Sequence, residues 1–171
     1  MKKATEGGVI SKDTIFDREG RIKRITLGMA EKMIDAAIRW GKDVAGFPVS
    51  VAVVDGAGGV IAAYRSEGAS PETLEIAMDK AFTAVAFEMP TRMAARMTSP
   101  KASMALDVDQ HGTSLLFRHK GRWCTVNGGI PIREAGTSMG MNVIGGIGTS
   151  GCPSGEDDNK CSQAGFSSLY D

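Results

Sequence analysis

The chain has 171 residues, of which 42% are hydrophobic, and this length and composition predict a single domain with a buried core of its own. Its twenty basic and twenty acidic residues cancel without a strong run of one sign, which argues against a protein that binds nucleic acid or an anionic membrane. No apolar stretch is long enough for a signal peptide or a membrane span, so we expect a cytoplasmic protein.

The beginning of the chain predicts an arm followed by a helix. Residues 1–24 are polar and lack periodicity, so we expect an N-terminal arm and then one domain over residues 25–171. Thr26 is the predicted N-cap of an amphipathic helix that keeps one apolar face and ends near Gly46.

A β-hairpin and two helices are expected next. The apolar run 48–55 and the strand 60–65 flank a Gly-rich turn. A Ser-Pro-Glu sequence at 70–72 then starts a helix that Pro90 ends, and a shorter helix is predicted for 91–97.

The second half of the chain predicts more strands and a last helix. Residues 114–118 and 123–126 form a predicted hairpin. We expect a shaped loop over 127–133, because its Gly pair is followed by a proline that cannot occupy the interior of a central strand. Residues 141–147 predict a fifth strand, and Ser154 caps a last helix. This order predicts an α+β fold in which helices flank a five-stranded, mostly antiparallel sheet.

Asp55 and Arg65 place charge on the predicted hairpin. Asp55 ends the first strand and Arg65 lies on the return strand, so a carboxylate and a guanidinium are expected at the rim of a hydrophobic sheet, where a small anionic ligand could dock. The alternative is that Asp55 only accepts hydrogen bonds from the turn amides, as Asp does in many tight turns.

We expect Asp55, Arg65 and Lys80 to meet Gly-rich backbone segments around one pocket. Arginine binds carboxylates through a planar fork, and glycine amides can form an anion nest. The expected ligand-binding residues are Asn127, Gly128, Gly129, Pro131, Gly148, Thr149 and Gly151. Lys80 has an alternative interpretation, a surface ion pair with Asp79.

Three cysteines, Cys124, Cys152 and Cys161, are odd in number and lack metal-ligand spacing, so we expect reduced thiols and no metal site.

Six motifs in order resemble the GlcG/HbpS-like haem-binding family, which is also similar to the C-terminal domain of PduO-type corrinoid adenosyltransferases. They are Val51-Ala52-Val53-Val54-Asp55 with Gly58-Gly59, Arg65, the stretch 76–84, Gly128-Gly129-Ile130-Pro131-Ile132-Arg133, the stretch 145–151, and Gly155-Glu156-Asp157-Asp158 with Cys161. The resemblance covers residues 25–169. It implies a profilin-like layered fold with a five-stranded sheet, assembly into dimers or larger homo-oligomers, and a haem or corrinoid ligand. A longer loop at 134–144 departs from the family pattern.

The residues support two functions. The first is binding of a small carboxylate or a tetrapyrrole, for which an axial ligand could come from His111, His119 or a methionine, although both histidines lie in polar segments typical of solvated side chains. The second is catalysis by a catabolic isomerase, hydratase or lyase on a hydroxy or keto acid, with Asp55 as general base and Arg65 and Lys80 as electrophilic stabilisers. Cys124 is a possible nucleophile, but its strand context favours a packed thiol.

Overall fold

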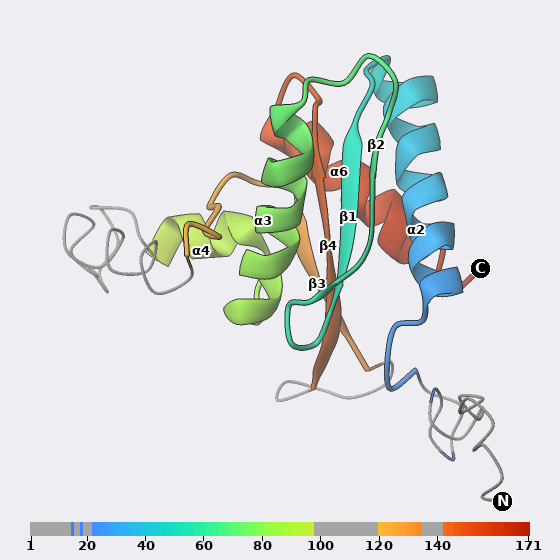
Figure 1. Cartoon of the computed structure of the whole chain (residues 1–171), viewed down its shortest axis with the longest axis vertical. Helices are drawn as coiled ribbons and strands as arrows, with labels where there is room; N and C mark the ends of the chain where they lie inside the picture. Colours follow the sequence, from blue (N-terminus) through green and yellow to red (C-terminus); the bar gives the residue numbers. More distant parts are fainter. Residues whose placement is uncertain (1–14, 16–17, 19–21, 98–119, 135–141) are drawn as a thin grey trace, which may run out of the picture.

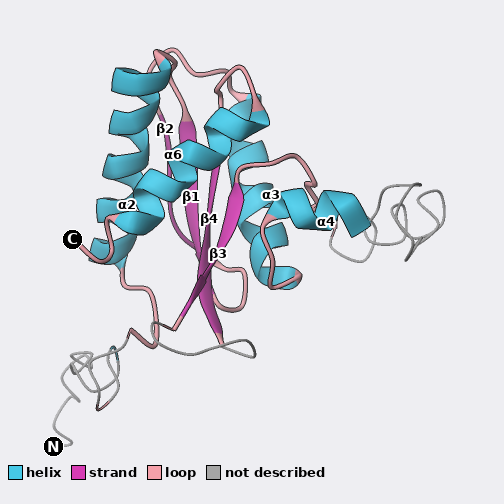
Figure 2. Cartoon of the chain, turned by 180° about the vertical axis from the view of Figure 1, so that it is seen from behind, coloured by secondary structure: helices cyan, strands magenta, loops and turns pink. Residues whose placement is uncertain are grey.

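The computed structural model describes residues 15, 18, 22–97, 120–134 and 142–171, which form three layers. Helices cover both faces of a central antiparallel sheet (Figures 1 and 2). In chain order the elements are α2 (Leu27–Trp40), the π-helical turn η1 (Gly41–Ala45), β1 (Ser50–Asp55), β2 (Val60–Arg65), α3 (Glu72–Ala86), α4 (Thr91–Met97), β3 (Gly129–Arg133), β4 (Val143–Ser150) and α6 (Gly155–Ser167).

The sheet has the strand order β2-β1-β4-β3, and every neighbouring pair is antiparallel. The two central strands are almost entirely buried. Ser50 pairs with both Arg65 and Ser150 at one end of β1, and Asp55 pairs with Gly145 at the other. This register fixes which predicted site residues can meet.

Helix α2 forms as its sequence predicts. The Thr26 hydroxyl accepts a hydrogen bond from the Met29 amide, which satisfies one of the free N–H groups of the first turn. Ala30, Met33 and Ala37 recur at helical spacing and are fully buried against the sheet and α6. The helix continues through η1 to Gly46, whose φ of 75° ends it in the left-handed conformation that glycine adopts most readily.

Helix α3 lies very close to β4 because the facing strand positions are glycines. A Cβ on Gly148 would overlap the Ala77 carbonyl oxygen and lie 2.6 Å from the Ala81 nitrogen. A Cβ on Gly146 would lie 2.8 Å from the Ala81 carbonyl oxygen. The glycines of β4 are therefore needed so that α3 can pack closely against the strand. They do not leave the backbone of β4 open to a ligand.

The predicted α+β class with an antiparallel sheet and flanking helices is confirmed, but three details of the prediction are wrong. The sheet formed by the described residues has four strands, not five. Residues 123–126 are not a strand, because the Cys124 amide donates to the Thr83 hydroxyl on α3 and Trp123 packs edge-on against Phe87. The expected loop over 127–133 contains β3, which accommodates its proline because it lies at the edge of this four-stranded sheet.

Several other predictions fall on residues outside the described part of the chain. These are the strand 114–118, both histidines, most of the N-terminal arm and residues 135–141 of the long loop. The fifth predicted strand, 141–147, corresponds to β4, which begins at Val143 and continues to Ser150. The profilin-like description stays a prediction.

We predict that Gly148→Ala lowers the free energy of unfolding by about 1–3 kcal/mol, the usual cost of overpacking a tight interior. The added methyl group meets α3 backbone atoms, which cannot rotate away. Gly28→Ala is the matched control, because a Cβ at this position in α2 meets nothing within 4 Å and alanine favours a helix. Urea denaturation would measure both, and equal stability of the two variants would contradict the packing argument.

Candidate functional site

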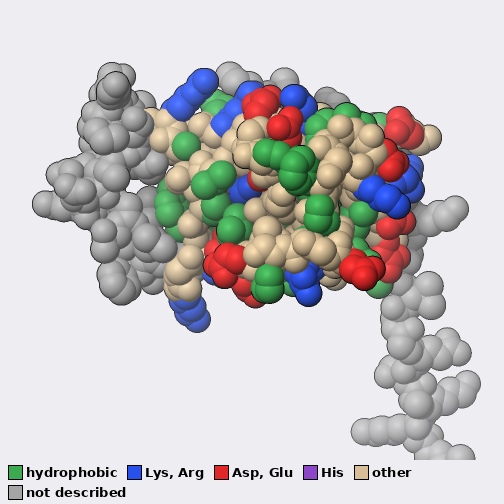
Figure 3. All heavy atoms as spheres, turned by 90° about the horizontal axis from the view of Figure 1, so that it is seen from above, with side chains coloured by type: hydrophobic (Ala, Val, Ile, Leu, Met, Phe, Trp, Pro, Cys, Tyr) green, Lys and Arg blue, Asp and Glu red, His purple; other side chains and the backbone are tan. Residues whose placement is uncertain are grey.

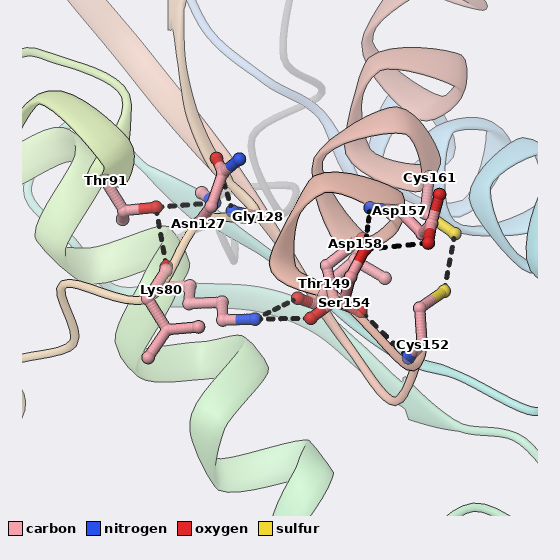
Figure 4. Close-up of polar contacts among 12 residues, drawn as sticks. Lys80, Thr91, Asn127, Gly128, Thr149, Cys152, Ser154, Asp157, Asp158 and Cys161 are labelled. Atoms are coloured by element: carbon pink, nitrogen blue, oxygen red, sulfur yellow. Dashed lines mark hydrogen bonds and ion pairs between the residues drawn. The ribbon is translucent and has the colours of Figure 1, made fainter.

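A buried ion pair joins the helical layers on the two sides of the sheet. The Lys80 ammonium, on α3, donates to the Asp158 carboxylate on α6 at 2.7 Å and to the Thr149 carbonyl oxygen at 2.9 Å (Figure 4). Lys80 is only 1% exposed and Asp158 4%. Charges this deeply buried persist only when they are paired and hydrogen-bonded, as they are here.

Further hydrogen bonds hold the backbone around this pair. The other Asp158 oxygen accepts from the Cys152 amide at 2.9 Å. The Gly128 carbonyl oxygen accepts from the Thr149 amide and from the Ser162 hydroxyl. Gly128 has a φ of 126°, and a Cβ there would lie 3.0 Å from the Lys80 ammonium nitrogen, so a side chain would displace the lysine.

The segment that leads into β3 is fixed in the same way (Figure 4). The Thr91 hydroxyl donates to the Val126 carbonyl oxygen and accepts from the Gly129 amide. The Asn127 side-chain oxygen accepts from the Gly128 amide at 3.0 Å. These amides were expected to bind a ligand, together with those of Gly148 and Thr149. The structure instead uses the amides of Gly128, Gly129 and Thr149 within the protein, and Gly148 lies inside a central strand.

The remaining predicted residues do not converge with this cluster. Asp55 and Arg65 lie at opposite ends of the hairpin, separated by the length of β1, about 16 Å at roughly 3.3 Å per residue. Asp55 accepts hydrogen bonds from the Ala57 and Gly59 amides, and Arg65 donates to the Ala69 carbonyl oxygen at 2.5 Å. The expectation of one pocket shared by Asp55, Arg65 and Lys80 is therefore wrong, because antiparallel pairing separates the first two and the third is buried. Pro131 lies in β3, and Gly151 is packed against Pro48 and Val49.

The sequence contained a signal for the burial of Lys80 that our prediction missed. Lys80 is spaced three residues from Ala77 and four from Ala84, so it belongs to the same face of α3 as these buried alanines. A lysine on a small-residue face needs a buried acid as its partner. The Asp79 alternative is also wrong: Asp79 faces Arg122, at 3.8 Å, and burial is the main cause that raises the pKa of its carboxyl group.

Two of the cavities that the described residues form, the larger ones, lie away from the ion pair. The first, which we call the Tyr64 groove, has a volume of about 440 Å³ and lies between the end of α2 and the end of β2. Its lining residues are Ile38, Lys42, Gly46, Phe47, Pro48, Tyr64, Ser66 and Glu67. Figure 3 looks onto the end of the molecule where α2 finishes and α3 begins, and hydrophobic side chains lie exposed there among charged ones.

Two features of the Tyr64 groove indicate a binding site. Phe47 and Tyr64 leave 44% and 53% of their surface exposed, a high value for aromatic side chains. Within the described part of the chain, the buried Ser66 hydroxyl has no hydrogen-bond partner, and such a group calls for a specific explanation. The sequence analysis missed this groove, because its residues are contributed by a helix end, a loop and a strand.

The second cavity, the Asp55 cavity, has a volume of about 450 Å³ at the start of α2. Asp55, Lys23, Arg24 and Asn142 contribute polar groups to its wall, and Ile25, Ile61 and Ile144 contribute apolar surface. This cavity places Asp55 beside two cations, but they are not the two that the sequence analysis named.

The fold and these cavities define a three-layer α+β domain with a tightly packed, ion-paired centre and ligand-sized hollows at its periphery. Residues 25–167 match the family described as "Haem degrading protein HbpS-like", and the chain belongs to this family.

Solved structures agree with this assignment. A double mutant of HbpS from Streptomyces reticuli is 29% identical, with 98% of this chain and 95% of that chain covered and a TM-score of 0.66. A second HbpS structure is 30% identical, with 96% and 97% covered and a TM-score of 0.66. A structure described as a PduOC:haem complex is 26% identical, with 85% and 94% covered and a TM-score of 0.69. No curated protein matches the sequence, and none of the helices in the described ranges is long and apolar enough to cross a bilayer.

We predict that Lys80→Met lowers the free energy of unfolding by about 3–5 kcal/mol, because it leaves the Asp158 carboxylate buried without a cation. Adding Asp158→Asn should recover part of this loss, since the asparagine keeps an acceptor for the Cys152 amide without the charge. Lys160→Met is the control, because its ion pair with Asp157 is exposed and should matter little. Chemical denaturation would compare the variants, and a double variant no more stable than Lys80→Met would contradict the electrostatic explanation.

Proposed function

We propose that this protein binds a haem-type tetrapyrrole in the Tyr64 groove. The observation that carries the proposal is one cavity that combines an exposed phenol, apolar and aromatic walls and a lysine. The family description and the related PduOC:haem complex support a tetrapyrrole over other flat ligands. The volume of about 440 Å³ lies within the usual range of ligand pockets, roughly 300–1,000 Å³.

The groove offers the groups that a haem needs. Tyrosine is one of the side chains that ligate haem iron in proteins, and the Tyr64 phenol is the candidate here. Ile38, Phe47 and Pro48 supply apolar surface for the porphyrin. The Lys42 ammonium is suited to a propionate. Bound haem would supply redox-active iron, while these residues orient and retain it.

Titration with haemin should give a stoichiometric Soret shift, and Tyr64→Phe should weaken binding about tenfold or more while removing the absorbance bands of a tyrosinate ligand. Tyr170→Phe is the matched control, because Tyr170 is similarly exposed but packs edge-on against Phe166, away from the groove. Thermal melts of each variant would check that the fold is intact.

Three results would count against this assignment. Haemin binding that is unchanged in Tyr64→Phe would exclude Tyr64 as the residue that ligates the iron. Loss of binding in His111→Ala or His119→Ala, with Tyr64→Phe unaffected, would move the iron ligand to a histidine. A stoichiometric spectral shift with hydroxocobalamin and none with haemin would change the ligand from haem to a corrinoid.

The Asp55 cavity supports a second candidate function, binding or conversion of a small hydroxy or keto acid. Lys23 and Arg24 provide positive charge for a carboxylate, and Asp55 provides a base beside it. In this proposal the two cations replace the expected Arg65 and Lys80, neither of which lines the cavity.

We predict that any turnover of a panel of hydroxy and keto acids falls at least about 100-fold in Asp55→Asn, because general-base catalysis contributes roughly that much. Asparagine keeps a side-chain oxygen for the Ala57 and Gly59 amides, so the turn should survive. Asp43→Asn on η1 is a control for the loss of one negative charge outside the cavity. Full activity in Asp55→Asn would exclude the proposed base.

A further inference from the structure

We propose that Cys152 and Cys161 are a redox-active thiol pair that a hydroperoxide converts to an intramolecular disulfide. Their sulfur atoms lie 3.6 Å apart (Figure 4). Cys152 lies in the turn between β4 and α6 and is half-buried, whereas Cys161 is in α6 and has no exposed surface. An oxidant can therefore reach the Cys152 thiol, and the buried Cys161 thiol lies next to it.

The backbone geometry favours closure of the bond. A disulfide needs a sulfur–sulfur distance of about 2.05 Å, so the two atoms must approach by roughly 1.5 Å. Cys161 is fixed by its helix, but Cys152 lies in an irregular turn, where a change of side-chain rotamer and a small backbone shift can supply that movement. The Cys152 amide donates to Asp158 on α6, so this turn is held beside the helix that carries Cys161.

The third cysteine, Cys124, is an internal control for the effect of exposure on oxidation. Cys124 is also half-buried, but its amide is bonded to Thr83 on α3, the helix that covers the other face of the sheet. It therefore cannot reach the pair without unfolding. A reaction that follows exposure alone would modify Cys124 as readily as Cys152, whereas the proposed reaction depends on the neighbouring sulfur.

The oxidation balances with a hydroperoxide as the two-electron acceptor. The Cys152 thiolate attacks the peroxide and breaks its O–O bond, which gives a sulfenic acid and, after protonation, an alcohol or water. The Cys161 sulfur then attacks the Cys152 sulfur, and the S–O bond breaks as water leaves. Two thiols and one hydroperoxide become one disulfide, one alcohol (or water) and one water.

The surroundings of the two thiols make their oxidation by a hydroperoxide slow at neutral pH. Burial is the main cause that raises the pKa of Cys152 to about 11, and it also raises the pKa of Cys161. The reactive thiolate is therefore scarce below that pH, and its fraction rises about tenfold for each pH unit up to the pKa. The pair should respond to sustained or alkaline peroxide exposure rather than to a brief pulse near pH 7.

Peptide mapping would test the proposal directly. The reduced full-length protein is treated with hydrogen peroxide, unfolded in the presence of the alkylating reagent so that buried thiols are also blocked, and cut with trypsin. Cleavage after Lys160 separates Cys152 from Cys161 in the sequence, so the disulfide appears as two joined peptides that part on reduction. The mass of the intact protein should fall by that of two hydrogen atoms, with one alkylatable thiol left. Cys152→Ser should abolish the joined peptide, and Cys124→Ser should leave it unchanged.

The kinetics give a second criterion. The rate of disulfide formation should rise about tenfold per unit between pH 7 and pH 9. Sulfinic acid on Cys152 without a joined peptide, cross-linked dimers, or a disulfide that includes Cys124 would each overturn the proposal, as would a rate independent of pH. The test uses no tetrapyrrole and no organic acid, so it succeeds or fails independently of both proposed functions.

Discussion

The buried contact between Lys80 and Asp158 is the interaction on which the arrangement of layers depends. It connects helices on opposite faces of the sheet beside Gly128, just before β3 begins, and the same carboxylate holds the turn after β4. Isolated charges would be very costly in this interior, so the pair forms only when α3, β4 and α6 are all in place. The glycines that line α3 and the lysine make that close approach possible. The ion pair and the close packing together thus fix the arrangement of α3, β4 and α6.

The elements that the sequence predicted well are those governed by local rules. Apolar spacing and capping defined α2, and the Gly-rich turn defined the hairpin. The errors arose where distant residues decide the structure. A proline that excludes a central strand is compatible with the edge strand β3, and Lys80 and Asp158 are 78 positions apart, so no periodicity in either segment pairs them. The position of Lys80 on an alanine-lined helix face was the one local sign of its burial.

The Gly-rich motifs and the candidate binding sites occupy different parts of the molecule, whereas Asp55, which ends another motif, lines the Asp55 cavity. Gly128, Gly129 and the Gly-rich β4 match the family pattern, yet their role in the structure is to admit α3 and Lys80. The Tyr64 groove and the Asp55 cavity are lined mainly by residues at the ends of elements, where side chains can change without disturbing the centre. The same scaffold can therefore carry different binding sites at its margins.

The π-helical turn at the end of α2 is a place where the chain can gain or lose one residue. A π turn holds one residue more than an α-helical turn of the same rise. On one side of it α2 keeps Met33 and Ala37 in the core, and on the other side Gly46 and Phe47 border the groove. The extra residue is absorbed between two fixed regions, so we expect an insertion or deletion of one amino acid to be tolerated better here than in the α-helical part. Evolution can therefore alter the rim beside Tyr64 by changing length as well as side chains.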